Sequence, residues 1–206
     1  MSTNENGKAI ANELKAQILI LLSLVGLMWA VEIADQVFFR PFLQTTLDFY
    51  GILPRNLIGL RGILFAPFLH GNFPHLIGNT LPFLVLGWLI MLREISDFFW
   101  VTLVAGLVSG LGTWLFGSPG IHIGASGVIF GYLGYLLFRG FFERSIISIA
   151  ISLGVGTLYG SLLWGVLPMQ YGISWEGHLF GFIGGVLAAR LLVIGSRDRR
   201  SQDRFS

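Results

Sequence analysis

Residues 98–116 read FFWVTLVAGLVSGLGTWLF, an apolar run without a charged side chain. At about 1.5 Å per residue, a helix of this length crosses most of the roughly 30 Å hydrocarbon core of a bilayer. A helix also closes its own backbone hydrogen bonds, which the bilayer interior demands. The stretch therefore predicts a transmembrane helix.

Apolar runs of similar length occur on both sides of it. The first covers residues 16–31 and continues through Glu32 and Asp35 to Phe39. We expect this span to be retained, because no small-residue cleavage site follows it. The other four runs are residues 74–92, 126–142, 145–166 and 178–194. The sequence thus predicts an all-α membrane protein, a six-transmembrane-helix bundle formed by residues 16–195.

The overall composition agrees with a membrane protein. Hydrophobic residues make up 54% of the 206 residues and charged residues 12%, whereas soluble domains carry about 25% charge. This excludes a soluble globular protein, a disordered chain and a nucleic-acid binder. The chain has no cysteine, which excludes a disulfide framework and a thiolate metal site.

Positive charge predicts how the spans are oriented. Six spans place both termini on one side, and Lys and Arg favour the cytoplasmic side. With residues 1–15 and the basic tail 196–206 in the cytoplasm, ten cations lie inside and three outside. Residues 40–73 then form a long first outer loop, which we expect to lie in the membrane interface as short helices. The outer cations are Arg40, Arg55 and Arg61; the inner ones are Lys8, Lys15, Arg93, Arg139, Arg144, Arg190, Arg197, Arg199, Arg200 and Arg204.

Polar residues gather at the outer ends of three spans. His75 and Asn79 open the second span, Ser126 the fourth and His178 the sixth. Such groups at membrane depth are costly and by default indicate function. Glu32 and Asp35 are interpreted as interfacial charges, with a proton pathway as the alternative.

Ser126 has the surroundings of a nucleophile. Gly124 and Gly127 allow backbone to approach closely, and a helix that begins at Ser126 favours an anion there. Serine needs a base within hydrogen-bond reach, and His178 is the candidate. Glycines on the fourth span and Gly181 and Gly185 on the sixth would let these two helices pack closely.

A Ser–His dyad is preferred to a triad, because the nearby Glu176 is expected to point elsewhere. His75 and Asn79 lie four residues apart on one helix face, and both can donate hydrogen bonds to an oxyanion. A metal site recruiting His70, His75, His122 and His178 is disfavoured, because no HExxH motif, cysteine or carboxylate cluster accompanies them. No cofactor is expected.

Three motifs together resemble the rhomboid family of intramembrane serine proteases: FLHGNFPHLIGN (68–79), GASG (124–127) and GHLFGFIGG (177–185). The resemblance implies Ser126 as nucleophile and His178 as base, with His75, Asn79 and the Ser126 amide forming the oxyanion hole. It also implies that Phe130 packs on the ring of His178 and that His70 braces the first loop.

The resemblance further implies single-span membrane proteins as substrates, cut near the outer membrane face after a small residue. Leu60 stands before Arg61 where the family carries tryptophan, which puts the bracing of the first loop in doubt. Two alternatives stay open: an inactive rhomboid-like protein that binds membrane helices, and a transporter or channel. The substrate's identity and the oligomeric state are not predicted.

Overall fold

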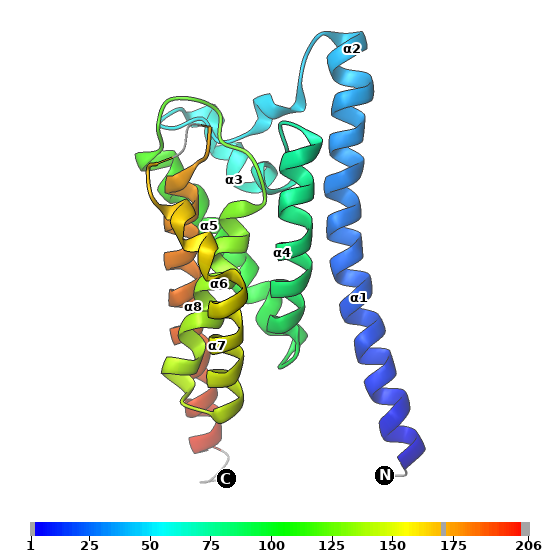
Figure 1. Cartoon of the computed structure of the whole chain (residues 1–206), viewed down its shortest axis with the longest axis vertical. Coiled ribbons are helices and arrows are strands. Elements are labelled where there is room, and N and C mark those ends of the chain that lie inside the picture. Colours follow the sequence, from blue (N-terminus) through cyan, green and yellow to red (C-terminus); the bar gives the residue numbers. More distant parts are fainter. Residues whose placement is uncertain (1–2, 170–171, 203–206) are drawn as a thin grey trace.

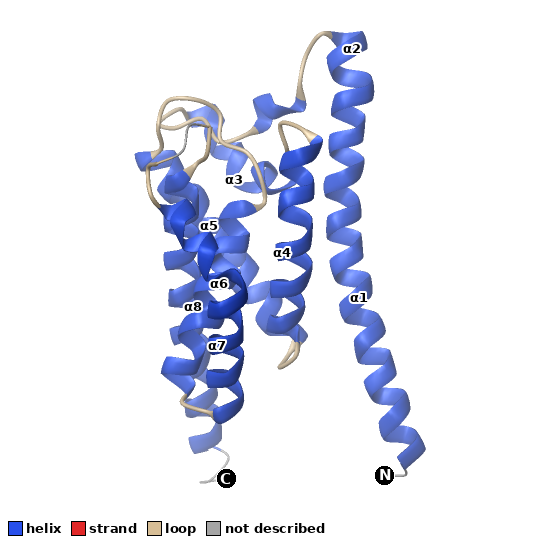
Figure 2. Cartoon of the chain, viewed as in Figure 1, coloured by secondary structure: helices blue, strands red, loops and turns tan. Residues whose placement is uncertain are grey.

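A computed structural model describes residues 3–169 and 172–202 of the chain. Within these residues every regular element is helical, apart from one isolated antiparallel bridge between Ile52 and His122 (Figure 2). The start of α1 and the end of α8 lie at the same end of the bundle (Figure 1). The long helices are α1 (Thr3–Ala34), α4 (Phe73–Met91), α5 (Ile95–Phe116), α6 (Ser126–Glu143), α7 (Ile146–Tyr159) and α8 (Trp175–Gln202).

Five helical segments of the described chain are long and apolar enough to cross a membrane: Glu5–Leu43, Phe73–Met91, Ile95–Phe116, Ile146–Val166 and Trp175–Gly195. The fourth of these joins α7 to a 3-10 helix, η5 (Gly160–Val166). Together with their exposed apolar side chains, such as Leu19, Leu81 and Leu153, these segments describe a multi-pass integral membrane protein. Helix α6 is not among the five.

Helix α6 forms the centre of the bundle. It contacts α4, α5, α7 and α8, and the side chains of Tyr132 and Leu133 on it are fully buried. Helix α1 instead lies at the edge and packs against α4 (Figure 1).

Two helices are longer than the apolar runs predict. Helix α1 begins at Thr3, so the described part of the expected polar tail 1–15 is helical. It is rich in good helix formers such as Ala9, Glu13 and Leu14 and has no proline. Helix α8 begins at Trp175, before His178, and continues to Gln202 into the expected tail 196–206. Residues 1–2 and 203–206 of the two tails lie outside the described residues.

Hydrogen bonds of charged residues connect the C-terminal end of α1 to the chain that follows it. The helix continues through a π-helical turn, η1 (Asp35–Phe39), and α2 (Arg40–Leu43). The carboxylate of Asp35 accepts hydrogen bonds from Arg40 Nε at 2.7 Å, Thr46 Oγ1 at 3.0 Å and Leu47 N at 2.6 Å. Glu32 accepts one from Gln36 Nε2 at 2.8 Å. Both carboxylates are buried, and these partners replace the water that an interfacial charge would have.

The first loop is folded into short helical turns. They are η2 (Leu47–Tyr50), η3 (Leu57–Arg61), α3 (Gly62–Phe65) and η4 (Ala66–Phe68). Arg61 braces them, since its guanidinium donates to the carbonyl of Phe49 at 3.0 Å and lies 4.4 Å from the centre of the Tyr50 ring. Arg61 makes these contacts although Leu60 precedes it.

Candidate active site

Ser126 and His178 meet where α6 and α8 begin. Ser126 is the first residue of α6, directly after a turn in which Gly124 has φ +112°, and His178 lies in the first turn of α8. The hydroxyl Oγ of Ser126 lies 2.8 Å from Nε2 of His178. The ring of Phe130, one helical turn after Ser126, stacks on the imidazole with ring centres 4.1 Å apart and planes inclined by 6°. A serine and a potential base are thus within hydrogen-bond reach.

His75 and Asn79 approach the same place from α4. The side chain of Asn72 caps this helix by accepting from the His75 amide at 2.9 Å, which fixes where the helix starts. A Cβ atom placed on Gly124 would lie 2.7 Å from His75 Nε2 and 3.6 Å from Asn79 Nδ2. The buried Nδ2 of Asn79 has no hydrogen-bond partner among the described residues. The side chains of His75 and Asn79 therefore both lie close to Gly124, two residues before Ser126.

His70 lies beside His75 rather than in the site itself. Its imidazole is buried and contacts that of His75 edge to face, with ring centres 5.0 Å apart. Neither ring nitrogen finds a hydrogen-bond partner in the described part of the chain. Burial, aided by the neighbouring His75, lowers the pKa of His70 to about 4. His70 is therefore a neutral packing group at neutral pH.

Glycines bring α6 and α8 into backbone contact below the dyad. A Cβ atom on Gly181 would lie 2.0 Å from the carbonyl oxygen of Gly127, and one on Gly185 would lie 1.8 Å from that of Gly131. Side chains at positions 181 and 185 would force the helices apart. Ser126 directly precedes Gly127, and His178 lies three residues before Gly181.

Ser109 of α5 supports the same junction and was not predicted. Its hydroxyl donates to the Gly177 carbonyl at 2.8 Å, and a Cβ atom on Gly127 would meet its oxygen at 2.2 Å. The signal in the sequence was a polar residue inside a mostly apolar span.

A cluster of polar side chains near the start of α8 was also missed; its members are Ser118, His122, Ser174 and Glu176. Oε1 of Glu176 accepts from the amide of Ser118 at 2.7 Å and from its hydroxyl at 2.5 Å, whereas the ring nitrogens of His178 contact Gly165 and Ser126. The His122 imidazole lies 2.7 Å from Ser174 Oγ and 2.9 Å from the Ser118 carbonyl. The cluster ties the segment before α6 to the start of α8.

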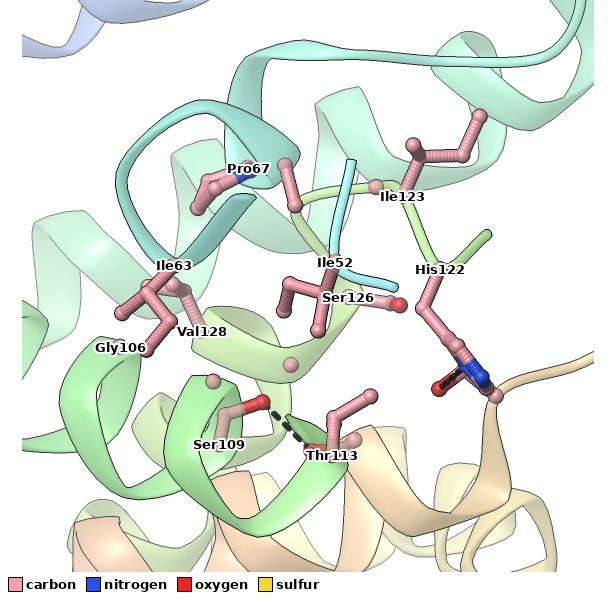
Figure 3. A pocket seen from close by; sticks show the side chains of 16 residues that line it. Ile52, Ile63, Pro67, Gly106, Ser109, Thr113, His122, Ile123, Ser126 and Val128 are labelled. Atoms are coloured by element: carbon pink, nitrogen blue, oxygen red, sulfur yellow. Dashed lines mark hydrogen bonds between the residues drawn. The ribbon is translucent and has the colours of Figure 1, made fainter. Parts of the chain in front are cut away.

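A small cavity opens beside Ser126 (Figure 3). It has about 30 Å³ of space for the centres of water-sized molecules, enough for about one water. Its walls are mostly apolar, and polar groups of Ser109, Thr113, His122 and Ser174 also line it. Within the described residues, no three His, Cys, Asp or Glu side chains are arranged to hold a metal ion.

The chain is similar to a known family and to several known proteins. The Rhomboid domain family matches residues 59–195, the part of the chain that carries Ser126, His178, His75 and Asn79. "Uncharacterized protein Rv1337" of Mycobacterium tuberculosis is 44% identical over 193 residues, which cover 89% of this chain and 78% of that protein.

Two relatives from Bacillus subtilis carry names that describe proteases. "Putative rhomboid protease YdcA" is 32% identical over 136 residues, covering 64% of this chain and 66% of that protein. "Rhomboid protease GluP" is 33% identical over 135 residues, covering 60% of this chain and 24% of that protein. By the family match over residues 59–195, the chain belongs to the rhomboid family.

Proposed function

We propose that this chain is an intramembrane serine endopeptidase that works with a Ser126–His178 dyad. The observation that carries the proposal is the 2.8 Å contact between Ser126 Oγ and His178 Nε2, near Asn79 Nδ2, which has no hydrogen-bond partner among the described residues. The protease names of the two Bacillus relatives support the same activity.

The chemistry follows from the arrangement of these groups. His178 Nε2 takes the proton of Ser126 as its oxygen attacks the scissile carbonyl. Asn79 Nδ2, the His75 ring and the Ser126 amide stabilise the resulting oxyanion. His178 then gives the proton to the leaving amine, and water hydrolyses the acyl-enzyme by the reverse route.

The proposed topology counts α6 as a sixth span, within a domain of residues 16–195. Tails 1–15 and 196–206 are then cytoplasmic, which agrees with the ten inner and three outer cations and with the common end of α1 and α8 (Figure 1). The site and the first loop lie at the opposite, outer end, with the loop in the membrane interface.

We infer that Ser126 lies below the outer membrane surface, because α6 is short and its other end, with Arg139 and Arg144, is assigned to the cytoplasmic interface. The helix has 18 residues, which at about 1.5 Å each is shorter than the roughly 30 Å hydrocarbon core. A site at this depth suits peptide bonds that lie close to the end of a transmembrane helix. We therefore propose single-span membrane proteins as the substrate class.

The test is cleavage of a labelled single-span protein by the purified chain in vesicles. We expect Ser126→Ala and His178→Ala each to abolish cleavage without unfolding the protein. The double variant should lose no more than either single one, since members of one catalytic unit fail together.

The matched control is Ser23→Ala, which changes an exposed serine on α1 and should leave cleavage unchanged. Full activity of Ser126→Ala, prepared from a host that lacks related proteases, would refute the proposed enzyme. Absence of cleavage by the wild-type protein would instead favour an inactive member of the family that binds membrane helices.

A further inference from the structure

The second nitrogen of the candidate base also has a defined partner. His178 Nδ1 lies 2.9 Å from the backbone carbonyl oxygen of Gly165. Gly165 belongs to neither helix of the dyad. It lies in η5, the 3-10 helix that continues α7.

This contact determines where the proton of the neutral imidazole resides. A carbonyl oxygen accepts hydrogen bonds and cannot donate them, so Nδ1 must carry the proton. The lone pair is then on Nε2, which faces Ser126 Oγ at 2.8 Å. A general base that removes the serine proton needs this tautomer.

Gly165 comes this close because it has no side chain. A Cβ atom at this position would lie 2.8 Å from Cζ of Phe130 and 3.2 Å from Nδ1 of His178. At Gly160, which opens the same 3-10 helix, an added Cβ would meet no atom of the described chain within 4 Å. Of these two glycines of η5, Gly165 is therefore the one that packs closely against Phe130 and His178.

The segment that supplies the carbonyl is the least buried of the five candidate spans. In the apolar 18-residue stretch of Ile146–Val166, 6% of the residues are buried inside the protein, against 28% to 44% in the other four spans. Its contacts are with α6 through α7 and with α8 through η5. A shift of this segment would remove the acceptor from His178 while Ser126 and His178 stay on their own helices.

We propose that Gly165 is a positioning residue of this site, whose carbonyl holds His178 in the reactive tautomer. The catalytic unit is then complete only while η5 is seated against α6 and α8. This inference rests on the proposed protease function.

The first test compares Gly165→Ala with Gly160→Ala in the vesicle cleavage assay. We expect Gly165→Ala to lower kcat by about 100-fold with KM changed less than twofold, since the added methyl group meets Phe130 and His178. Gly160→Ala should keep the kcat of the wild-type protein. Equal kcat for Gly165→Ala and wild type would overturn the inference.

A second variant avoids the added methyl group and any folding defect that it causes. Replacing Val166 by its α-hydroxy analogue converts the Gly165–Val166 amide to an ester, whose carbonyl is a weaker acceptor. Cleavage should slow about tenfold, whereas the same exchange at Leu163 in η5 should have less than a twofold effect. Equal slowing by both esters would assign the effect to the backbone of η5 and refute a role for this carbonyl.

Nitrogen NMR of ¹⁵N-histidine-labelled protein gives a readout that does not depend on cleavage. The His178 signals, identified by their loss in His178→Asn, should show Nδ1 protonated in wild type and the proton shared between both nitrogens in Gly165→Ala. The same tautomer in both proteins would overturn the inference even if the protease function stands. Without any cleavage by wild type, the protease function fails, while the spectra still test the hydrogen bond.

Discussion

The substitution Gly181→Ala would add a methyl group at the point where α8 touches α6. Its Cβ would lie 2.0 Å from the carbonyl oxygen of Gly127, whereas an ordinary contact begins at 3.4 Å. The two backbones would have to separate by roughly 1.4 Å, because neither partner is a side chain that can turn away. His178 lies one helical turn before Gly181, and Ser126 is the neighbour of Gly127.

This separation would act directly on the dyad. The distance from Ser126 Oγ to His178 Nε2 would grow from 2.8 Å to about 4 Å, beyond hydrogen-bond reach. A misplacement of about 1 Å can cost about 100-fold in rate. We therefore expect kcat to fall by about 100-fold or more, together with a loss of about 1 to 3 kcal/mol in stability from overpacking.

The assay is kcat for a single-span substrate in vesicles, with the melting temperature measured on the same preparations. Gly195→Ala is the matched control, since it changes the same helix at a position where no described atom lies within 4 Å of the added Cβ. It should leave both quantities unchanged. Wild-type kcat in Gly181→Ala would show that the α6–α8 contact does not set the geometry of the dyad.

Two further predictions concern the groups around the dyad. Asn79→Ala should lower kcat by about 100-fold with little change in melting temperature, because Nδ2 of Asn79 has no hydrogen-bond partner within the described chain. A large drop in melting temperature at unchanged kcat would mark Asn79 as structural. Burial lowers the pKa of His70 from 6.5 to about 4, so the unfolded chain binds this proton more readily and stability should fall by about 3 kcal/mol as the pH drops from 6.5 to 4. Chemical unfolding at several pH values should show this loss in wild type and lack that part of it in His70→Phe.

The sequence predicts the helices best where lipid contact and local pattern act together. The apolar runs 74–92 and 98–116 match α4 and α5 closely, because spanning a bilayer requires a continuous apolar helix. The ends of α1 and α8 were missed, since helical propensity carries both helices beyond their apolar runs. Hydropathy says nothing about such polar extensions.

The parts of the site that were missed depend on backbone and on distant partners. Glu176 and Ser118 meet across 58 positions in the sequence, and no local pattern connects them. Gly165 acts through its carbonyl oxygen, which every residue possesses, so its residue type shows only that close approach is allowed. Ser109 was visible as a polar residue in an apolar span, but its partner is again a backbone carbonyl.

The helix that carries the proposed nucleophile is the long helix that does not qualify as a membrane span by hydropathy. Eleven of its 18 residues are buried, among them Tyr132, Tyr135 and Arg139. Helices α4, α5, α7 and α8 cover it, so it meets protein where the others meet lipid. Small and polar side chains are therefore tolerated on it, and its glycines allow close contact with α8. The hydroxyl of Tyr132 lies 2.8 Å from that of Thr102, and Arg139 forms an ion pair with Asp97 at 3.3 Å. A serine protease inside a membrane needs such a helix, because polar catalytic groups at this depth must be enclosed by protein. Helix α6 is not recognised as a span because its hydropathy is low. This low hydropathy follows from its central position, which the proposed chemistry requires.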